Sequence, residues 1–146
     1  MHQSTKNKEL GLAINRDIWN AKRFDLIPDY FTEDFIADYS PRVVRSGRDA
    51  VRAMVESSHS TFEDFKETVH LAIADEEYIV LHFTISGRQV GDWGPIKATG
   101  RFVSYDEIVI MQVRDEKVCH QRGVSDVLLA LQQLKAIPDP AGFTDA

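Results

Sequence analysis

The stretch of sequence that decides the fold begins at Lys97, ends at Leu134 and reads KATGRFVSYDEIVIMQVRDEKVCHQRGVSDVLLALQQL. Two long runs within it are rich in β-branched and aromatic residues, which favour strands. An acidic turn, Asp115-Glu116, separates the two runs. We therefore predict a hairpin made of a long strand over residues 98–113 and a last strand over residues 118–125.

Two further features are predicted within this stretch. The adjacent acids Asp106 and Glu107 interrupt the apolar pattern of the long strand, so we expect a bend or a bulge there. Residues 126–134 follow the last strand as an apolar segment. We expect this segment to be a helix, with Asp126 at or near its N-cap.

The rest of the chain is predicted to place its helices first and most of its strands last. The expected elements are a helix over residues 8–24, a helical turn at Pro28, a short strand over 35–39, a helix over 49–58, a loop over 62–65, strands over 68–74 and 78–86, and a loop over 87–95. This order indicates the α+β class, with helices packed on one face of a curved antiparallel sheet. Closed by the N-terminal helices, such a sheet forms a cone-shaped barrel with an internal pocket. The sequence contains no internal repeat and no linker, so we expect a single domain over residues 1–146.

Composition and charge restrict the possible function classes. Lys and Arg number 17 against 23 Asp and Glu, and the formal net charge of −6 argues against a nucleic-acid-binding surface. The single cysteine, Cys119, excludes an internal disulfide and fits a reducing compartment, and without a second cysteine or a close ligand pair it indicates no metal site. No apolar run approaches the roughly 20 residues that a membrane span needs, and the N-terminus lacks the apolar core of a signal peptide. We therefore expect a cytoplasmic protein that binds neither nucleic acid nor membrane.

A row of residues on the last predicted strand is the main indication of function. Val118, His120, Arg122, Val124 and Asp126 lie at even spacing, so in an extended strand they share one face. His120 is the candidate general base, because an imidazole takes up and returns a proton near neutral pH and its valine neighbours indicate a pocket wall. A histidine on an exposed strand face is the alternative. We predict that loss of His120 lowers any activity more than loss of another residue.

Asp126 and Asp106 complete the candidate catalytic set. Asp126 either caps the final helix, which would contribute about 1 kcal/mol, or acts as an acid/base group in an apolar pocket. Asp106 either orients His120 across the hairpin or faces solvent at a bulge.

Tyr39 and Arg122 are candidates for contacting the substrate. Tyr39 would donate a hydrogen bond to a substrate oxygen, and a core tyrosine with a satisfied hydroxyl is the alternative. Arg122 would bind a substrate carboxylate or pair with Asp106, and a solvated strand arginine is the alternative.

Three further side chains are candidates for lining the pocket. His82 lies on the strand predicted over residues 78–86, where it would either line the pocket or lie exposed. Trp19 and Trp93 would form part of the pocket wall or of the core.

Motifs spread over most of the chain resemble those of a known family. They are Tyr30-Phe31 with Asp34-Phe35, Gly47-Arg48-Asp49-Ala50-Val51, Phe62-Glu63-Asp64-Phe65, Gly91-Asp92-Trp93-Gly94, Ala98-Thr99-Gly100-Arg101, and residues 118–133. In their order and spacing they resemble the SnoaL-like polyketide cyclases, which lie within the broader nuclear-transport-factor-like fold.

The resemblance implies a cone-shaped α+β barrel with a solvent-shielded pocket, usually in a homo-oligomer. In characterised members of the family, an acidic residue near the end of the sheet acts as general acid/base in an intramolecular aldol ring closure, without cofactor or metal. The family's last strand commonly carries an acid, then Trp, then Asp, and the corresponding residues here are His120, Arg122 and Asp126. Tyr39 stands where the first strand often has His, and Gln112 where the long strand usually has Arg, so Gln112 is also a candidate substrate-binding residue.

Two classes of function follow from the sequence. The first is a cofactor-independent enzyme that transfers protons on a small, largely apolar carbonyl compound, in ring closure, isomerisation or hydrolysis. The second is a non-catalytic small-ligand-binding or assembly domain of the same fold. Asp106, His120 and Asp126 gathered around a pocket would favour the enzyme, whereas their exposure to water would favour the binding domain. In both cases we expect a homodimer or higher homo-oligomer, because long exposed strands must be covered.

Overall fold

The structure is a computed structural model that describes residues 2–40 and 43–138. Its helical elements are α1 (Gln3–Ala13), the π-helix η1 (Ile14–Asn20), the 3₁₀ turn η2 (Phe24–Leu26), α2 (Ile27–Tyr30), α3 (Arg48–Thr61) and α4 (Val127–Gln133). Its strands are β1 (Phe31–Ser40), β2 (Val43–Ser46), β3 (Phe62–Ala74), β4 (Tyr78–Gln89), β5 (Phe102–Arg114) and β6 (Lys117–Ser125). None of the helices in these described ranges combines the length and the apolar character that crossing a membrane requires.

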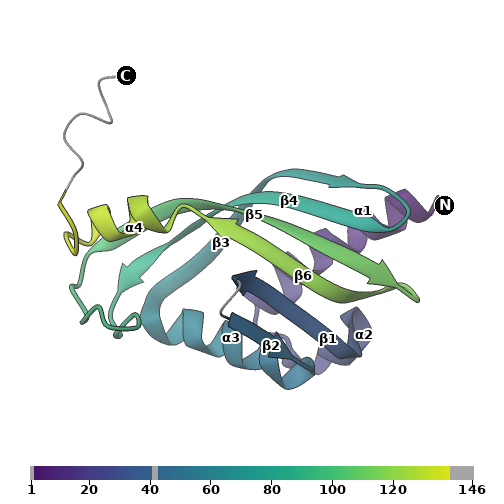
Figure 1. Ribbon diagram of the computed structural model, residues 1–146, viewed down its shortest axis with the longest axis horizontal. Coiled ribbons are helices and arrows are strands. Elements are labelled where there is room, and N and C mark those ends of the chain that lie inside the picture. The colour runs from purple at the N-terminus through teal and green to yellow at the C-terminus, as the bar shows by residue number, and fades with distance from the viewer. Residues whose placement is uncertain (1, 41–42, 139–146) are drawn as a thin grey trace.

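The strands form one curved sheet in the order β2-β1-β6-β5-β4-β3 (Figure 1). Neighbouring strands run antiparallel except β1 and β6, which pair in parallel. The predicted α+β class, with a curved sheet and N-terminal helices, is confirmed. Two details differ from the expectation. The sheet is mixed, because β1 lies beside the last strand and runs in the same direction, and it stays open, with β2 and β3 as its edges.

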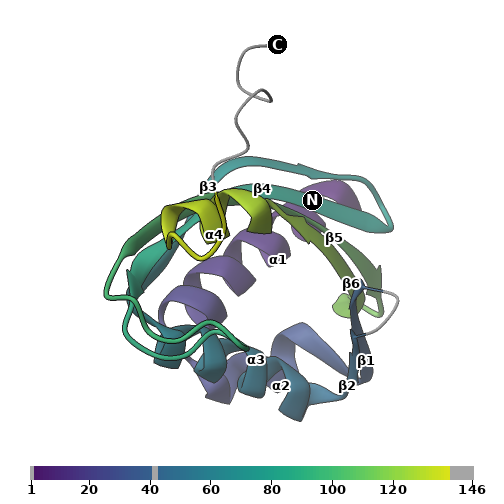
Figure 2. The ribbon, with the colours of Figure 1, turned by 60° about the vertical axis from the view of Figure 1, so that its left-hand side comes forward.

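The N-terminal helices pack on the concave face of the sheet (Figure 2). α1 lies against β3 and β4, η1 lies against β3, and α3 contacts β3 and β1. Gly11 of α1 faces the sheet so closely that an added Cβ would come within 2.7 Å of the Ile79 Cγ2 atom. A side chain at this position would therefore push the helix away from the strands.

The core lies between these helices and the concave face. The fully buried side chains include Ile14, Ile18, Phe31, Phe35, Val55, Ile79, Val103, Met111 and Val118. On β5, buried and exposed side chains alternate, so Val103, Tyr105, Val109 and Met111 point inward. This alternation is the period of two that the sequence predicted for the long strand.

Two local predictions, the loop over residues 62–65 and the bulge near Asp106, were wrong. Residues 62–65 are the start of β3 rather than a loop, and Asp64 has a positive φ of 54° within a register shift. β5 passes regularly through Asp106, which pairs with Thr84. The bulge of the β5–β6 hairpin lies instead on β6, where Cys119 is an extra residue between the pairs Val113–Val118 and Gln112–His120.

A buried glutamine holds the segment between β4 and β5. Gln89 is fully buried, and its Oε1 accepts hydrogen bonds from the backbone N–H of Thr99 at 3.1 Å and from the Thr99 hydroxyl at 2.8 Å. Its Nε2 donates to the carbonyl of Ile96 at 3.3 Å. This one side chain therefore satisfies polar groups on a segment that has little other regular structure.

We expect Gln89→Leu to lower the free energy of unfolding by about 1 to 3 kcal/mol, because the Thr99 and Ile96 groups would lose their partner. Urea denaturation measures the change. The matched control is Gln112→Leu, whose partly exposed side chain bonds Glu77 on the outer face, and it should cost no more than about 0.5 kcal/mol. Equal losses in the two variants would contradict this role of Gln89.

Candidate functional site

A cavity of about 430 Å³ lies between the concave face of the sheet and the helices. A much smaller recess of about 10 Å³ lies deeper, and the two share Trp19, Glu67 and Glu107 among their lining residues. Both of the shared acids come from the sheet, Glu67 from β3 and Glu107 from β5. Two carboxyl groups therefore lie at the junction between the cavity and its recess.

Glu67 is almost completely buried, with 5% of its surface exposed. Burial raises the pKa of its carboxyl well above the usual value, and the negative charge of Glu107 raises it further. Asn15 acts in the opposite direction, because its Nδ2 donates to Glu67 Oε2 at 2.8 Å. Burial therefore favours the protonated form of Glu67, which is the form that can donate a proton.

Glu107 is the second acid of the pair. Burial raises its pKa, while the Ser125 hydroxyl, which donates to Glu107 Oε1, lowers it. Two acids whose pKa values are raised by burial therefore line the same cavity, which is a feature of sites that donate and abstract protons.

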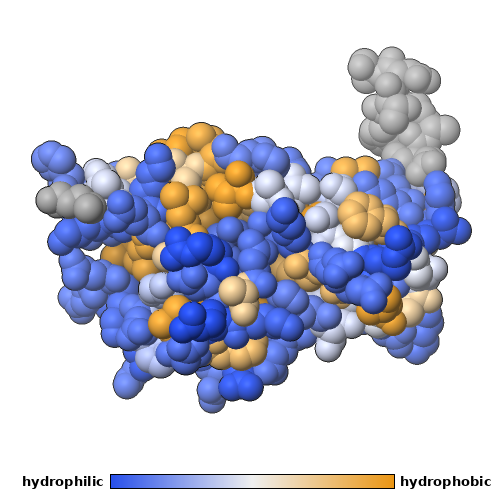
Figure 3. Space-filling model, turned by 180° about the vertical axis from the view of Figure 1, so that it is seen from behind, coloured by the Kyte–Doolittle hydropathy of each residue, from blue (hydrophilic) through white to orange (hydrophobic). Residues whose placement is uncertain are grey.

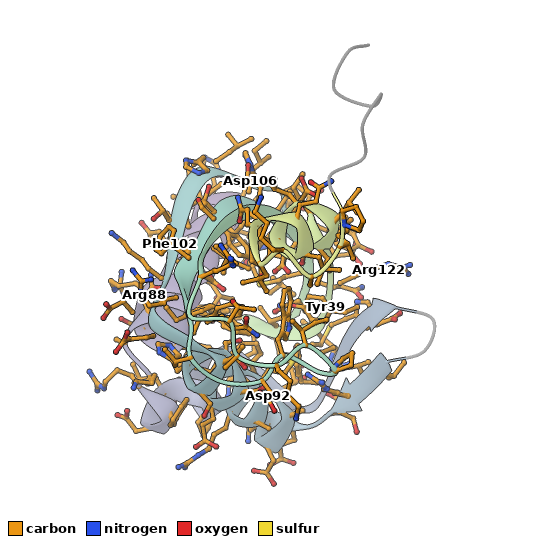
Figure 4. The ribbon with its side chains drawn as sticks, turned by 90° about the vertical axis from the view of Figure 1, so that its left-hand side faces the viewer. Tyr39, Arg88, Asp92, Phe102, Asp106 and Arg122 are labelled. Atoms are coloured by element: carbon orange, nitrogen blue, oxygen red, sulfur yellow. The ribbon has the colours of Figure 1, made fainter. Side chains whose placement is uncertain are left out.

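Tyr39 of β1 also lines the cavity. Its side chain points toward the space that the curved sheet and the helices enclose (Figure 4). Its hydroxyl oxygen accepts a hydrogen bond from Gln121 Nε2, which leaves its own O–H free to donate. Burial and the charge of Glu107 raise the pKa of Tyr39, so the hydroxyl stays protonated. Gly123 leaves space for the aromatic ring of Tyr39, since a Cβ at this position would come within 2.5 Å of Tyr39 Cε1.

Aromatic side chains form part of the remaining wall of the cavity. Trp93 lies 6.1 Å from Tyr105 in a stacked arrangement and 5.5 Å from Phe62, measured between ring centroids. Trp19 lies 6.4 Å from Phe65. The lining also includes Arg45 and three hydroxyl residues of α3, Ser57, Ser58 and Thr61. The cavity therefore presents both aromatic rings and several polar groups to a bound molecule.

Comparison with known proteins identifies the family. The family model described as SnoaL-like polyketide cyclase matches residues 11–134. The chain belongs to this family. No curated protein matches the sequence.

Solved structures of similar fold include SnoaL-like proteins from several bacteria. A proposed SnoaL-like polyketide cyclase from Jannaschia sp. CCS1 has a TM-score of 0.83 at 19% identity, covering 92% of this chain and 95% of that chain. TsrD from Streptomyces laurentii has a TM-score of 0.82 at 25% identity, covering 91% and 97%. An LEH-like epoxide hydrolase from M. tuberculosis has a TM-score of 0.71 at 13% identity, covering 92% of each chain. The SnoaL-like fold is therefore shared by proteins described with different reactions.

The bulge at Cys119 moves the predicted catalytic row away from the cavity. Val118 is buried beneath the sheet, but His120 and Arg122 lie on the opposite, outer face, so the prediction that Val118 and His120 share a face was wrong. Figure 4 shows Arg122 on the outer side of the sheet, and its Nη1 lies 3.8 Å from Asp38 Oδ2. Gln112 pairs with His120 in the ladder and donates to Glu77 on the same outer face. None of these three residues lines the cavity.

Asp106 belongs to a separate network on the outer face. It accepts hydrogen bonds from the Thr84 hydroxyl at 2.6 Å and from His82 Nε2 at 2.8 Å, and these bonds lower its pKa. His70 Nε2 lies 2.6 Å from the Thr84 hydroxyl oxygen. Of the two alternatives for Asp106, the contact with His120 is not made, because the register places His120 opposite Gln112. His82 is likewise on the outer face and does not line the cavity.

Asp126 is the cap of α4. Its Oδ1 accepts a hydrogen bond from the Leu129 backbone N–H at 3.1 Å, which confirms the predicted N-cap. It borders a shallow outer depression with His82 and Asp106 rather than the cavity. Of the candidate residues, Tyr39, Trp19 and Trp93 do line the cavity.

The sequence contained signals for the acids that were missed. Glu107 alternates with Tyr105 and Val109, which are buried on the inner face of β5. Glu67 alternates in the same way with Phe65 and Val69. An acid at the inward position of an otherwise apolar strand is the pattern that would have identified both. Within residues 2–40 and 43–138, no three His, Cys, Asp or Glu side chains are placed to hold a metal ion.

The raised pKa of Glu67 predicts how stability depends on pH. Because the folded protein retains this proton above the usual value of 4.5, folding gains stability from Glu67 below pH 4.5 and loses it as the pH rises through the folded pKa. Glu67→Gln removes the titration, so the free energy of unfolding of this variant should rise relative to wild type as the pH increases above about 4.5.

Urea denaturation at a series of pH values between about 4 and 8 measures the difference. Glu63→Gln, an exposed glutamate of the same strand, is the control and should leave the difference constant. A Glu67→Gln difference that does not change with pH would show that Glu67 has an ordinary pKa.

Proposed function

We propose that this SnoaL-like protein is a cofactor-independent enzyme that transfers protons on a small, largely apolar carbonyl compound. The observation that carries the proposal is that two acids with raised pKa values, Glu67 and Glu107, line one cavity together with the Tyr39 hydroxyl. Raised pKa values of acids in a pocket are typical of acid/base catalysts. The set of acids differs from the one expected from sequence, because Asp106, His120 and Asp126 lie outside the cavity.

The proposed chemistry begins with Glu107 as the general base. Its carboxylate takes a proton from the carbon next to the substrate carbonyl, and Glu67 donates its proton to the carbonyl oxygen, so that an enol forms. The Tyr39 O–H donates a hydrogen bond to the same oxygen. In a ring closure, the enol carbon attacks a second carbonyl of the same molecule, the enol proton returns to Glu67, and the new alkoxide takes the proton from Glu107. In an isomerisation, another carbon takes the proton from Glu107 while the enol proton returns to Glu67. The cavity's own carboxyl and hydroxyl groups supply each of these proton transfers.

The alternative is a domain of the same fold that binds a small ligand without catalysis. The observation that favours it is the exposure of Asp106 and Arg122 on the outer face. The acid/base residues predicted from the sequence, Asp106, His120 and Asp126, do not gather around the cavity. A binding domain would still use Trp19, Trp93 and Tyr39 as contacts, but it would not need two acids with raised pKa values in its cavity.

The test is deuterium incorporation from D₂O into a panel of apolar 1,3-dicarbonyl compounds, because exchange detects proton abstraction before the final product is known. Glu107→Gln and Glu67→Gln should each lower the exchange rate by about 100- to 10,000-fold. His120→Ala should stay within about threefold of wild type, because its side chain lies on the outer face.

Two outcomes would contradict the enzyme proposal. One is Glu107→Gln exchanging as fast as wild type, and the other is His120→Ala losing as much activity as the glutamate variants. If wild type catalyses no exchange but a panel compound raises its melting temperature, the binding domain is the better description.

We further propose that the protein works in the cytoplasm, because a single cysteine, Cys119, fits a reducing compartment. We also propose that it is a homodimer formed through the outer face of the sheet. Apolar side chains are exposed on this face at Leu71, Ile73, Ile108, Ile110 and Val124, the last with 75% of its surface accessible. Hydrophobic groups reach the surface at the upper edge of the molecule in Figure 3, among mostly hydrophilic ones. A partner on this face would remove them from water.

We expect wild type to sediment as a dimer and Ile110→Lys as the 16.6 kDa monomer, because a charge in the middle of an apolar interface cannot be desolvated cheaply. Val44→Lys is the control, since Val44 is exposed on β2 at the far edge of the sheet. Analytical ultracentrifugation at micromolar concentration distinguishes the species. A monomeric wild type, or an Ile110→Lys variant that remains dimeric, would contradict the proposed interface.

A further inference from the structure

We infer that Asn15 is a positioning residue for the proposed acid/base pair: it holds one oxygen of Glu67 and leaves the other to carry the transferable proton. The inference rests on the proposed function for its catalytic meaning. The bond between Asn15 and Glu67 can be tested independently of it.

The contact is buried and specific. Asn15 exposes 8% of its surface and Glu67 5%, and the Asn15 Nδ2 donates to Glu67 Oε2 over 2.8 Å. In a neutral carboxylic acid, the carbonyl oxygen is the better acceptor and the hydroxyl oxygen carries the proton. Oε2 is therefore the carbonyl oxygen of protonated Glu67, and the proton lies on Oε1. This fixes which oxygen takes part in proton transfer.

A second asparagine fixes the backbone beneath this carboxyl group. Asn20 Oδ1 accepts the backbone N–H of Glu67 at 2.8 Å, and Asn20 Nδ2 donates to the Glu67 carbonyl at 2.9 Å. β3 is an edge strand, so these two groups of Glu67 face away from β4. Asn20 therefore holds the main chain of Glu67 while Asn15 holds its side chain.

The π-helix explains why both asparagines reach the same residue. An α-helix turns about 100° per residue, so residues five apart would diverge by about 140°. In a π-helix the hydrogen bonds run from residue i to residue i+5, which brings residues five apart close to one another on the helix surface. η1 spans Ile14–Asn20 and includes Asn15 and Asn20. The π-helix therefore lets both asparagines contact Glu67.

The contact also has a chemical consequence. An N–H bond to a carboxylate is stronger than one to the neutral acid, so Asn15 favours the ionised form of Glu67. Burial and Glu107 favour the neutral form. Asn15 thereby keeps the acid able to release its proton during turnover. Without this bond, Glu67 would hold its proton to a higher pH.

The experiment is a titration of the Glu67 side-chain carboxyl by ¹³C NMR in protein labelled at glutamate, with Glu67→Gln identifying the signal. Asn15→Leu has nearly the same volume and no donor, and it should raise the titration midpoint of Glu67 by about one pH unit or more. The matched control is Asn7→Leu on the adjoining helix α1, where Asn7 is also buried but donates to the Asp75 carbonyl at 3.0 Å. This control should leave the midpoint unchanged while carrying a similar cost in stability.

A midpoint that is the same in Asn15→Leu and wild type would overturn the inference, as would an equal shift in Asn7→Leu. If Asn15→Leu does not fold, Asn15→Ser is measured instead, because its shorter hydroxyl cannot span the distance to Glu67 and the same upward shift is expected. The titration needs no substrate, so its failure is distinct from that of the proposed function. In the exchange assay, Asn15→Leu should lower kcat more than it changes KM and should move the pH profile upward with the Glu67 midpoint.

Discussion

One extra residue in the last strand determines which side chains reach the cavity. Because Cys119 is inserted opposite the β5 ladder, Val118 can lie in the core while Gln121 and Gly123 still face inward. Gln121 then reaches Tyr39, and Gly123 leaves the space that its ring occupies. Without the bulge, one side of this network would turn to the outer face, since a shift of one residue exchanges the two faces of a strand.

The acid pair in the cavity is maintained against a cost in folding free energy. A buried carboxyl group is tolerated when it is neutral or well hydrogen-bonded, and Glu67 and Glu107 use both means. Asn15 and Ser125 supply the bonds, and burial raises the pKa of both acids, which favours their neutral forms. Burial of the surrounding aliphatic and aromatic side chains stabilises the fold and offsets this cost.

Sequence patterns predicted the fold better than they predicted the site. The period of two in β5 and the capping aspartate Asp126 follow from local chemistry, and both were confirmed. The position of the bulge at Cys119 depends on pairing with another strand, which periodicity within one strand does not contain. For the same reason the face of His120 was assigned wrongly. Glu107 could have been placed from its alternation alone, whereas the contact of Asn15 with Glu67 required the π-helix, which no residue pattern indicated.

The contact of Asn20 with the backbone of Glu67 also affects how the protein behaves in a crowded solution. An open sheet ends in strands whose N–H and C=O groups can pair with strands of other molecules and begin aggregation. On β3 that pairing is interrupted at mid-strand, because Asn20 already occupies both groups of Glu67. The irregular backbone at Asp64 distorts the same edge a few residues earlier. Asn20, which binds the backbone of the proposed catalytic acid, therefore also makes this edge a poor template for fibril growth.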